Sequence, residues 1–405
     1  MKAKLDNYLI SSSGEMKMRD KTETEWILAC LRSTWETDSI DKLVPRDSIN
    51  WEHLLSLSNR ERVSPLIYTL TYEKRLLPSL VQEQFQQIYR QNLVRNTHLL
   101  HELGLILDRM AKENIPVILL KGAGLIESSY QNPAARPMAD LDLLILPEYI
   151  QQARIILEDA GYGSPAVEPW PEFNQRYRQV VEYTKGEGGR YSYLIDLHWG
   201  ILDIPHYEHI QIGDIFERAI QADNFSSFPC PEDHFLVLCG HLGLHERYNA
   251  PLIRYYDLAL LIQQDSNNFS WEEALERGTD WQLVIPIQRA LFRLNSLWPE
   301  IIPESVSRKA AEMVPTPEEH RIHSLVVDRQ RNPTSDVLFY FATMPGFSRK
   351  SRYFLEQAFP SPAYMRQLYC PHRPYLWPLT YILRAGLVFQ YLSQARQKSS
   401  ADGLL

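Results

Sequence analysis

The sequence contains little cysteine, and the few cysteines form no recognisable pattern. There are four in 405 residues, scattered along the chain: Cys30, Cys230, Cys239 and Cys370. None of the intervals between them matches a zinc-binding or disulfide spacing. This usage is typical of a protein kept in a reducing compartment.

Long uncharged hydrophobic runs are missing as well. The N-terminal stretch lacks the continuous apolar core of a signal peptide, and no stretch of about 18 residues is both apolar and uncharged throughout. The nearest approach, Leu376 to Leu392, contains Arg384 and several polar residues. We therefore predict no transmembrane helix, a cytoplasmic location, and a loose leader over residues 1 to about 20.

Positive charge is in deficit over the whole chain but concentrated in its last part. The net charge of −8 gives no reason to expect unspecific nucleic-acid binding. Positions 345–405, however, hold eight Lys or Arg against two acids, a local balance of +6 that leaves −14 for the remainder. Aromatic side chains are interleaved there. This basic segment is either a surface for a polyanion, such as nucleotide phosphates or RNA, or a set of solvated helices with aromatic packing.

The composition describes a globular protein with more than one domain. The chain is 44% hydrophobic and 23% charged, which supplies enough apolar material for a sizeable core, and its 405 residues suggest two or three domains. Helical patterns flank a central stretch that is rich in strand patterns. We predict an N-terminal helical region at 1–113, a core at 114–212 and a C-terminal helical region at 213–405.

Helical periodicity dominates both flanks. The longest pattern runs from Ser79 to Glu113, where apolar residues recur every three or four positions. Gly104 is its one breaker, so either a single helix or two helices meeting near Gly104 fits the pattern. From about Asp214 onward we again expect helices. The clearest candidates outside the longest pattern are Pro147–Ala160, Glu232–Glu246, Leu252–Gln263, Trp271–Arg277 and Gln282–Leu297.

The central stretch contains four short apolar runs of the kind that form buried strands. They are Val117–Leu120, Met138–Leu146, Gln179–Thr184 and Tyr191–Trp199. Residues 185–190 are rich in glycine and predict a hairpin loop between the last two. The fold class that follows is α+β and mostly helical.

Two acids interrupt the second of these runs. Residues two apart on a strand point to the same face, so Asp140 and Asp142 are expected side by side, with backbones roughly 7 Å apart. Asp196 is a third acid inside an apolar run, and the three carboxylates converge if the two strands pair. Buried carboxylates are costly without a cation, and shared carboxylates are what two Mg²⁺ ions need. The alternative is that these acids cap strands or pair with nearby arginines.

A glycine-containing turn precedes the acid pair. Lys121-Gly122-Ala123-Gly124 lies between a strand and a helical segment and offers backbone N–H groups and a cation to a phosphate chain. The GxxxxGK[ST] pattern of a P-loop is absent, and a plain strand-to-helix turn is the alternative. Arg136 lies four residues before Asp140, where it reaches either a phosphate or an acid.

Further polar residues have two interpretations each. His198 shares a face with Asp196 and either lines the site or packs. His241 and His245 are four apart, but the residues between them do not form a zinc motif, so substrate contact and ordinary polar contacts remain. Asp257, beside Arg254, is either half of a structural ion pair or a nucleotide contact.

These residues together resemble a known family. The sequence resembles the uncharacterised bacterial nucleotidyltransferase family within the DNA polymerase β-type superfamily. The resemblance lies in three segments: Leu120-Lys121-Gly122, residues 136–144 with the acid pair, and Ile195-Asp196-Leu197-His198-Trp199. The resemblance implies a small mixed sheet with helices on one side, flanked by helical domains. It matches Asp140 and Asp142 to the paired metal carboxylates, Asp196 to the third, and Gly122 to the phosphate-binding glycine.

The chain departs from the superfamily pattern at the turn. That pattern has Gly-Ser or Gly-Gly and a shorter gap to the acids, whereas here Ala123 follows Gly122 and Asp140 comes eighteen positions after it. Lys121 is therefore expected to replace the phosphate contact of the missing serine.

The resulting prediction is a Mg²⁺-dependent nucleotidyltransferase that transfers a nucleoside monophosphate from an NTP to an unknown acceptor. Two Mg²⁺ ions would lie on Asp140, Asp142 and Asp196, and the triphosphate would be held by the residues Lys121, Gly122, Ala123 and Arg136. The acceptor is a small molecule, an RNA or a protein. The alternatives are a non-catalytic nucleotide-binding or interaction protein on the same fold, and a toxin-like enzyme that modifies RNA or protein.

Overall fold

The structure is a computed structural model. It describes residues 18–36, 46–164, 167–186, 192–222, 226–264, 269–299, 301–327, 333–369, 374–381 and 384. Most of the predicted leader and most of the 185–190 loop lie outside the described residues; the end of the predicted leader is helical, since α2 begins at Met18. Within them, no helix is both long and apolar enough to cross a membrane.

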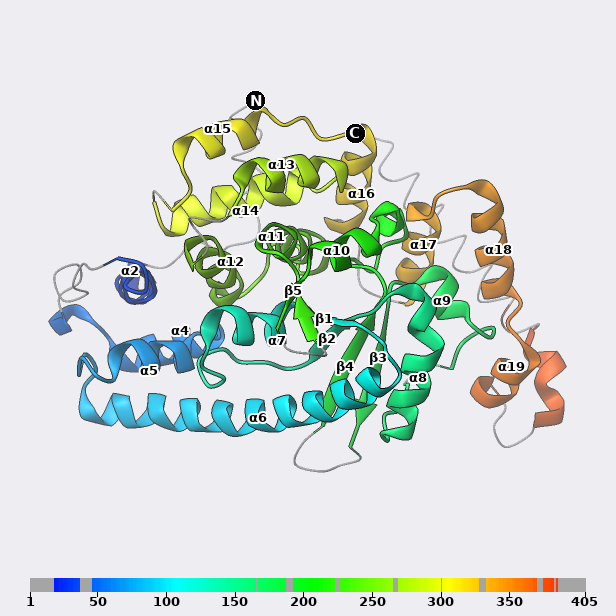
Figure 1. The fold of residues 1–405 in the computed structure, drawn as a ribbon, viewed down its shortest axis with the longest axis horizontal. Helices are drawn as coiled ribbons and strands as arrows, with labels where there is room; N and C mark the ends of the chain where they lie inside the picture. Colours follow the sequence, from blue (N-terminus) through cyan, green and yellow to red (C-terminus); the bar gives the residue numbers. More distant parts are fainter. Residues whose placement is uncertain are drawn as a thin grey trace.

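A six-stranded mixed sheet forms the centre of the molecule (Figure 1). Its strand order is β3-β4-β2-β1-β6-β5, with β2 parallel to β4, β1 parallel to β6, and the other neighbours antiparallel. The strands are β1 (Val117–Leu119), β2 (Leu141–Leu144), β3 (Val180–Lys185), β4 (Tyr193–His198), β5 (Ile220–Gln221) and β6 (Ser226–Phe228). One small sheet among many helices confirms the mostly helical α+β class.

Two details of the sheet differ from the sequence prediction. The second strand is shorter than its apolar run, so Asp142 lies within β2 whereas Asp140 lies just before it. The chain after Asp214, predicted to be helical, also contributes β5 and β6 to the sheet. Strands of two and three residues are too short to show an alternating pattern in the sequence.

Four helices precede the sheet in the described part of the chain. They are α2 (Met18–Arg32), α4 (Trp51–Arg60), α5 (Ser64–Thr71) and α6 (Ser79–Lys112), with a short 3₁₀ turn at Arg46–Ser48. The pattern around Gly104 forms one continuous helix, α6, which runs beneath α5 and the sheet in Figure 1. Gly104 is exposed and has open space where a side chain would be, so its only cost is the weak helix propensity of glycine.

Helical segments also follow β1, β2, β4 and β6. The segment after β1 is α7 (Lys121–Leu125), continued by a π-helical turn, Ile126–Tyr130; α8 (Ile150–Asp159) follows β2 through the 3₁₀ turn Pro147–Tyr149. The four helices predicted after Asp214 are present. The one predicted at Gln282–Leu297 begins at Val284, because Gln282 has a positive φ of 55°, which is not helical. The remaining elements are α9 (Phe173–Tyr177), 3₁₀ Pro205–His209, α10 (Ile212–Arg218), α11 (Pro231–Gly240) with the π-helical turn His241–His245, α12 (Leu252–Gln264), α13 (Trp271–Asp280), α14 (Val284–Leu297), α15 (Glu304–Glu312), α16 (Pro317–Val327), α17 (Pro333–Thr343), α18 (Phe347–Ala358), α19 (Pro362–Tyr369) and 3₁₀ Pro374–Leu376.

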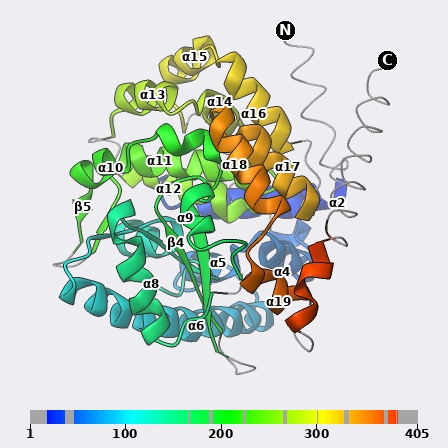
Figure 2. The ribbon, with the colours of Figure 1, turned by 90° about the vertical axis from the view of Figure 1, so that its right-hand side faces the viewer.

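The two faces of the sheet belong to different apolar clusters. Val117 and Leu119 of β1 pack with residues of α6 and α8, whereas Ile118 joins the cluster formed with N- and C-terminal helices. Figure 2 shows α6 and α8 on one side of the sheet and α11 and α12 on the other. Because side chains alternate along β2, Asp142 lies on the same face as Leu144, which belongs to the second of these clusters.

Candidate metal and nucleotide site

The strand register places two of the predicted acids side by side. In the parallel pair β2 and β4, Asp142 is directly opposite Asp196, and Leu144 is opposite His198. The potential ligand atoms of Asp142, Asp196 and His198 all lie within 4.8 Å of one another, and these residues are the one such cluster of acids, histidines and cysteines in the described part of the chain. Asp140 is not part of this cluster, because it lies before β2.

Lys121 and His198 both contact the carboxylate of Asp142. The Nζ of Lys121 donates a hydrogen bond to Oδ1 at 2.6 Å, and the Nε2 of His198 lies 3.1 Å from the same oxygen. Asp142 is 3% exposed. Burial raises the pKa of its carboxyl, but the charge of Lys121 and the contact with His198 outweigh burial and hold that pKa well below its usual value. Asp142 is therefore ionised at neutral pH.

The pKa values of the two neighbouring acids, in contrast, are raised. Burial first, and then the charge of Asp142, raises the pKa of Asp196 to about 6. The same two causes raise the pKa of Asp140, against the opposing charges of Lys121 and Arg254. The three carboxylates thus repel one another, and a cation bound between them would relieve that repulsion.

The turn after β1 is built by close packing. Leu120 is the N-cap of α7, and Lys121 has a φ of 45°, which is uncommon for a residue other than glycine. Gly122 and Ala123 are buried. A Cβ on Gly122 would lie 2.9 Å from Nη1 of Arg136, so a side chain here would force this guanidinium to shift; close packing thus favours glycine whether or not the turn binds a phosphate.

Arg136 contacts an acid and not the open site. Its side chain is 2% exposed, and its Nε and Nη2 donate to Oδ1 and Oδ2 of Asp257 at 2.8 and 2.7 Å. Tyr130 donates to the same carboxylate at 2.7 Å. The prediction that Arg136 holds the triphosphate is therefore not supported. Asp257 is half of a structural ion pair, but its partner is Arg136, whereas Arg254 pairs with Glu246 at 3.0 Å.

The histidines of α11 and its π-helical extension do not form a zinc site. His241 and His245 stack with ring centroids 4.5 Å apart. Burial, and then the nearby charge of Lys121, holds the pKa of His241 well below its usual value, so its ring is neutral beside the acid cluster. His234 is buried farther inside, where burial lowers its pKa to about 4.

Glu182 is a residue near the site that the sequence analysis missed. It is opposite Asp196 in the antiparallel pair β3 and β4, so both side chains are on the same face of the sheet. Glu182 is exposed. Its strand was expected, but the register that brings it next to Asp196 has no signal in the sequence.

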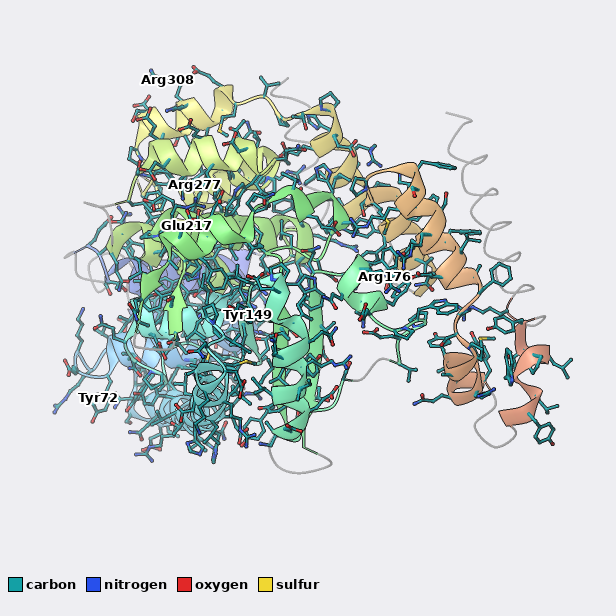
Figure 3. The ribbon with its side chains drawn as sticks, turned by 45° about the vertical axis from the view of Figure 1, so that its right-hand side comes forward. Tyr72, Tyr149, Arg176, Glu217, Arg277 and Arg308 are labelled. Carbon is teal, nitrogen blue, oxygen red and sulfur yellow. The ribbon has the colours of Figure 1, made fainter. Side chains whose placement is uncertain are left out.

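The described part of the basic C-terminal segment uses its charges internally. Arg349 pairs with Glu208, and Arg352 pairs with Glu356 at 2.9 Å. Figure 3 shows Arg176 on α9, next to the C-terminal helices, and it pairs with the same Glu356 at 3.0 Å. Arg384 lies over the rings of two tyrosines. These contacts favour the aromatic-packing interpretation; Arg373, Arg396 and Lys398 lie outside the described residues.

The fold and site define a class of protein. A small mixed sheet with adjacent strand carboxylates, next to a cationic strand-to-helix turn, is suited to handling phosphate groups through a divalent cation. A family model described as an uncharacterised nucleotidyltransferase matches residues 47–299, which include the whole site. The chain belongs to this nucleotidyltransferase family. A search of curated proteins found no match.

Proposed function

We propose that this protein is a Mg²⁺-dependent nucleotidyltransferase of the DNA polymerase β-type superfamily. It would transfer a nucleoside monophosphate from an NTP to an acceptor hydroxyl and release pyrophosphate. The observation that carries the proposal is the register that sets Asp142 directly opposite Asp196, with the ammonium group of Lys121 at the same carboxylate.

The residues present fit a divalent cation. Carboxylate oxygens are the ligands that Mg²⁺ prefers, and Asp142 and Asp196 supply them within 4.8 Å. The pKa of Asp196 is raised by burial first and then by the negative charge of Asp142, and a bound cation would neutralise that charge. In this proposal Asp142 and Asp196 hold Mg²⁺, and Asp140, just before β2, completes the ligand set. The bound ions would lower the pKa of the acceptor hydroxyl and neutralise charge on the phosphates.

The chain's own residues would position the triphosphate. Gly122 and Ala123 lie in the first turn of α7, where backbone N–H groups have no partner within the helix. Lys121 brings a positive charge to the same turn, so we assign the triphosphate to Lys121 and to these two amides. Arg136 is left out of this set because Asp257 occupies its guanidinium.

Label transfer tests the proposal. Purified protein is incubated with each α-³²P-labelled NTP, Mg²⁺ and a cell extract, and transfer of label is compared between the wild type, Asp196→Asn and Asp142→Asn. Asp108→Asn is the matched control, because Asp108 is an exposed acid on α6. We expect transfer by the wild type and the control but not by the two site variants. Equal transfer by Asp142→Asn would overturn the proposal.

The same experiment separates the alternatives. Absence of transfer together with Mg²⁺-dependent NTP binding, measured by calorimetry, would favour a non-catalytic nucleotide-binding protein. Label recovered in RNA or protein would favour the toxin-like enzyme. The described basic residues near the C-terminus give that alternative no support, because Arg349 and Arg352 already pair with acids.

A further inference from the structure

A cavity of about 690 Å³ lies between α4, α5 and α6. Its floor includes Pro137, from the segment that leads into β2, and Tyr193, the first residue of β4. Cavities of roughly 300–1,000 Å³ are typical of sites for small molecules. None of the site residues discussed above lines it, so the cavity is a separate feature of the molecule.

The lining of this cavity is basic. Arg62, Arg95 and His98 contribute to it, and its lining includes no acid. In the part of the chain that the structure describes, neither arginine forms an ion pair; Arg95 donates only a long hydrogen bond, at 3.4 Å, to the carbonyl of Ala139. Two arginines without acidic partners in one concave site favour an anion, and the fork of a guanidinium matches a phosphate.

The cavity and the acid cluster share one end of the sheet. Pro137 is three residues before Asp140, and Tyr193 is three residues before Asp196. Strand β4 starts at the cavity with Tyr193, and the segment that leads into the parallel strand β2 passes the cavity at Pro137. Three residues along a strand span about 10 Å, and the hydrogen bond from Arg95 to the carbonyl of Ala139, the residue before Asp140, brings this arginine near the first of the acids.

We propose that this cavity binds the acceptor, and that the acceptor is a small phosphorylated molecule such as a sugar phosphate. The inference rests on the proposed function. Arg62 and Arg95 would hold the acceptor's phosphate while a hydroxyl at its other end extends to the acid cluster. That hydroxyl oxygen forms a bond to the α-phosphorus of the NTP, the bond from this phosphorus to the bridging oxygen breaks, pyrophosphate leaves, and the hydroxyl proton passes to solvent.

An RNA acceptor fits these observations less well. Single-stranded nucleic acid is bound by an extended basic groove with aromatic side chains that stack on successive bases. The cavity has one tyrosine in its lining and a volume suited to a single small molecule. An RNA end is therefore kept as a competing outcome of the test.

Calorimetry with ribose 5-phosphate tests the proposal on the full chain. The wild type is compared with Arg62→Gln, Arg95→Gln and the control Arg90→Gln, since Arg90 is an exposed arginine on the same helix as Arg95 and does not line the cavity. We expect the wild type and Arg90→Gln to bind, and each cavity variant to bind about tenfold more weakly or worse, because each loses a charge-assisted hydrogen bond. Ribose without phosphate should bind none of the proteins.

Asp142→Asn separates this proposal from the proposed function. It should abolish binding of Mg²⁺-NTP and leave binding of ribose 5-phosphate unchanged. Loss of ribose 5-phosphate binding in Asp142→Asn, equal binding by all arginine variants, or no binding by the wild type would overturn the cavity assignment. Binding of a short RNA with the same arginine dependence, in place of ribose 5-phosphate, would also overturn it.

Discussion

Replacing Asp257 with asparagine should destabilise the protein by about 3–5 kcal/mol, the cost of leaving a buried charge without its partner. Asp257 is 0% exposed and Arg136 is 2% exposed. The carboxylate accepts two hydrogen bonds from Arg136 and one from Tyr130, all between 2.7 and 2.8 Å. Asparagine can accept only part of this set and carries no charge. The guanidinium would then remain buried without a counter-charge.

The assay is urea unfolding followed by circular dichroism, with Lys309→Met as the control. Lys309 pairs with Glu272 at 3.7 Å, but the two side chains are 57% and 81% exposed, so this pair should contribute about 1 kcal/mol or less. The double variant Arg136→Met with Asp257→Leu should recover much of the loss, since apolar residues can replace a buried ion pair. The reasoning is refuted if Asp257→Asn is no more harmful than Lys309→Met.

Three other predictions follow from the site. Lys121→Met should raise the pKa of Asp142, seen as a carboxyl titration by NMR, and reduce label transfer about tenfold or more through loss of a buried charge-assisted contact. The pKa of Asp196 is raised to about 6 in the folded, metal-free protein, so the folded protein binds the carboxyl proton more tightly than the unfolded chain does. The free energy of unfolding, measured by urea titration relative to Asp196→Asn, should therefore fall as pH rises from about 4 to 6. Added Mg²⁺ should restore the lost stability. Gly122→Ala should destabilise the protein by about 1–3 kcal/mol through overpacking. Gly104→Ala, in open space on a helix, should stabilise it by about 0.5–1 kcal/mol. Thermal unfolding midpoints of both variants equal to that of the wild type would contradict both predictions.

The strands of the acid cluster could be predicted because each apolar run lies within one short stretch of the sequence. The apolar runs at 138–146 and 191–199 predicted that Asp142 and Asp196 would lie in buried strands; the two strands do pair, with Asp142 buried and Asp196 half-buried. Asp140 was placed on the same strand because the apolar run continues past it, but hydrogen bonding in the structure begins only at Leu141. The end of a strand depends on its partner, which no local pattern contains.

Long-range pairs account for most of what was missed. Arg136 and Asp257 are 121 positions apart, so nothing near either residue distinguishes an arginine that binds a phosphate from one that pairs with a distant acid. The cavity has the same character, because α4, α5, α6 and the start of β4 each supply only a part of its wall. Only the assembled fold brings together its two arginines, which form no ion pair among the described residues.

The negative charge at the acid cluster couples the binding of its two proposed ligands, Mg²⁺ and the nucleoside triphosphate. The opposing charges at Asp140, next to the cluster, come from Lys121, Arg254 and Arg136, but Arg254 is already paired with Glu246 and Arg136 with Asp257. A nucleoside triphosphate adds further negative charge to a place where burial and repulsion already raise two carboxyl pKa values. It can enter only together with cations, so metal and nucleotide are expected to bind as one unit. Lys121 stabilises Asp142 in their absence, and that contact explains how the chain can fold with these acids adjacent before any ligand binds.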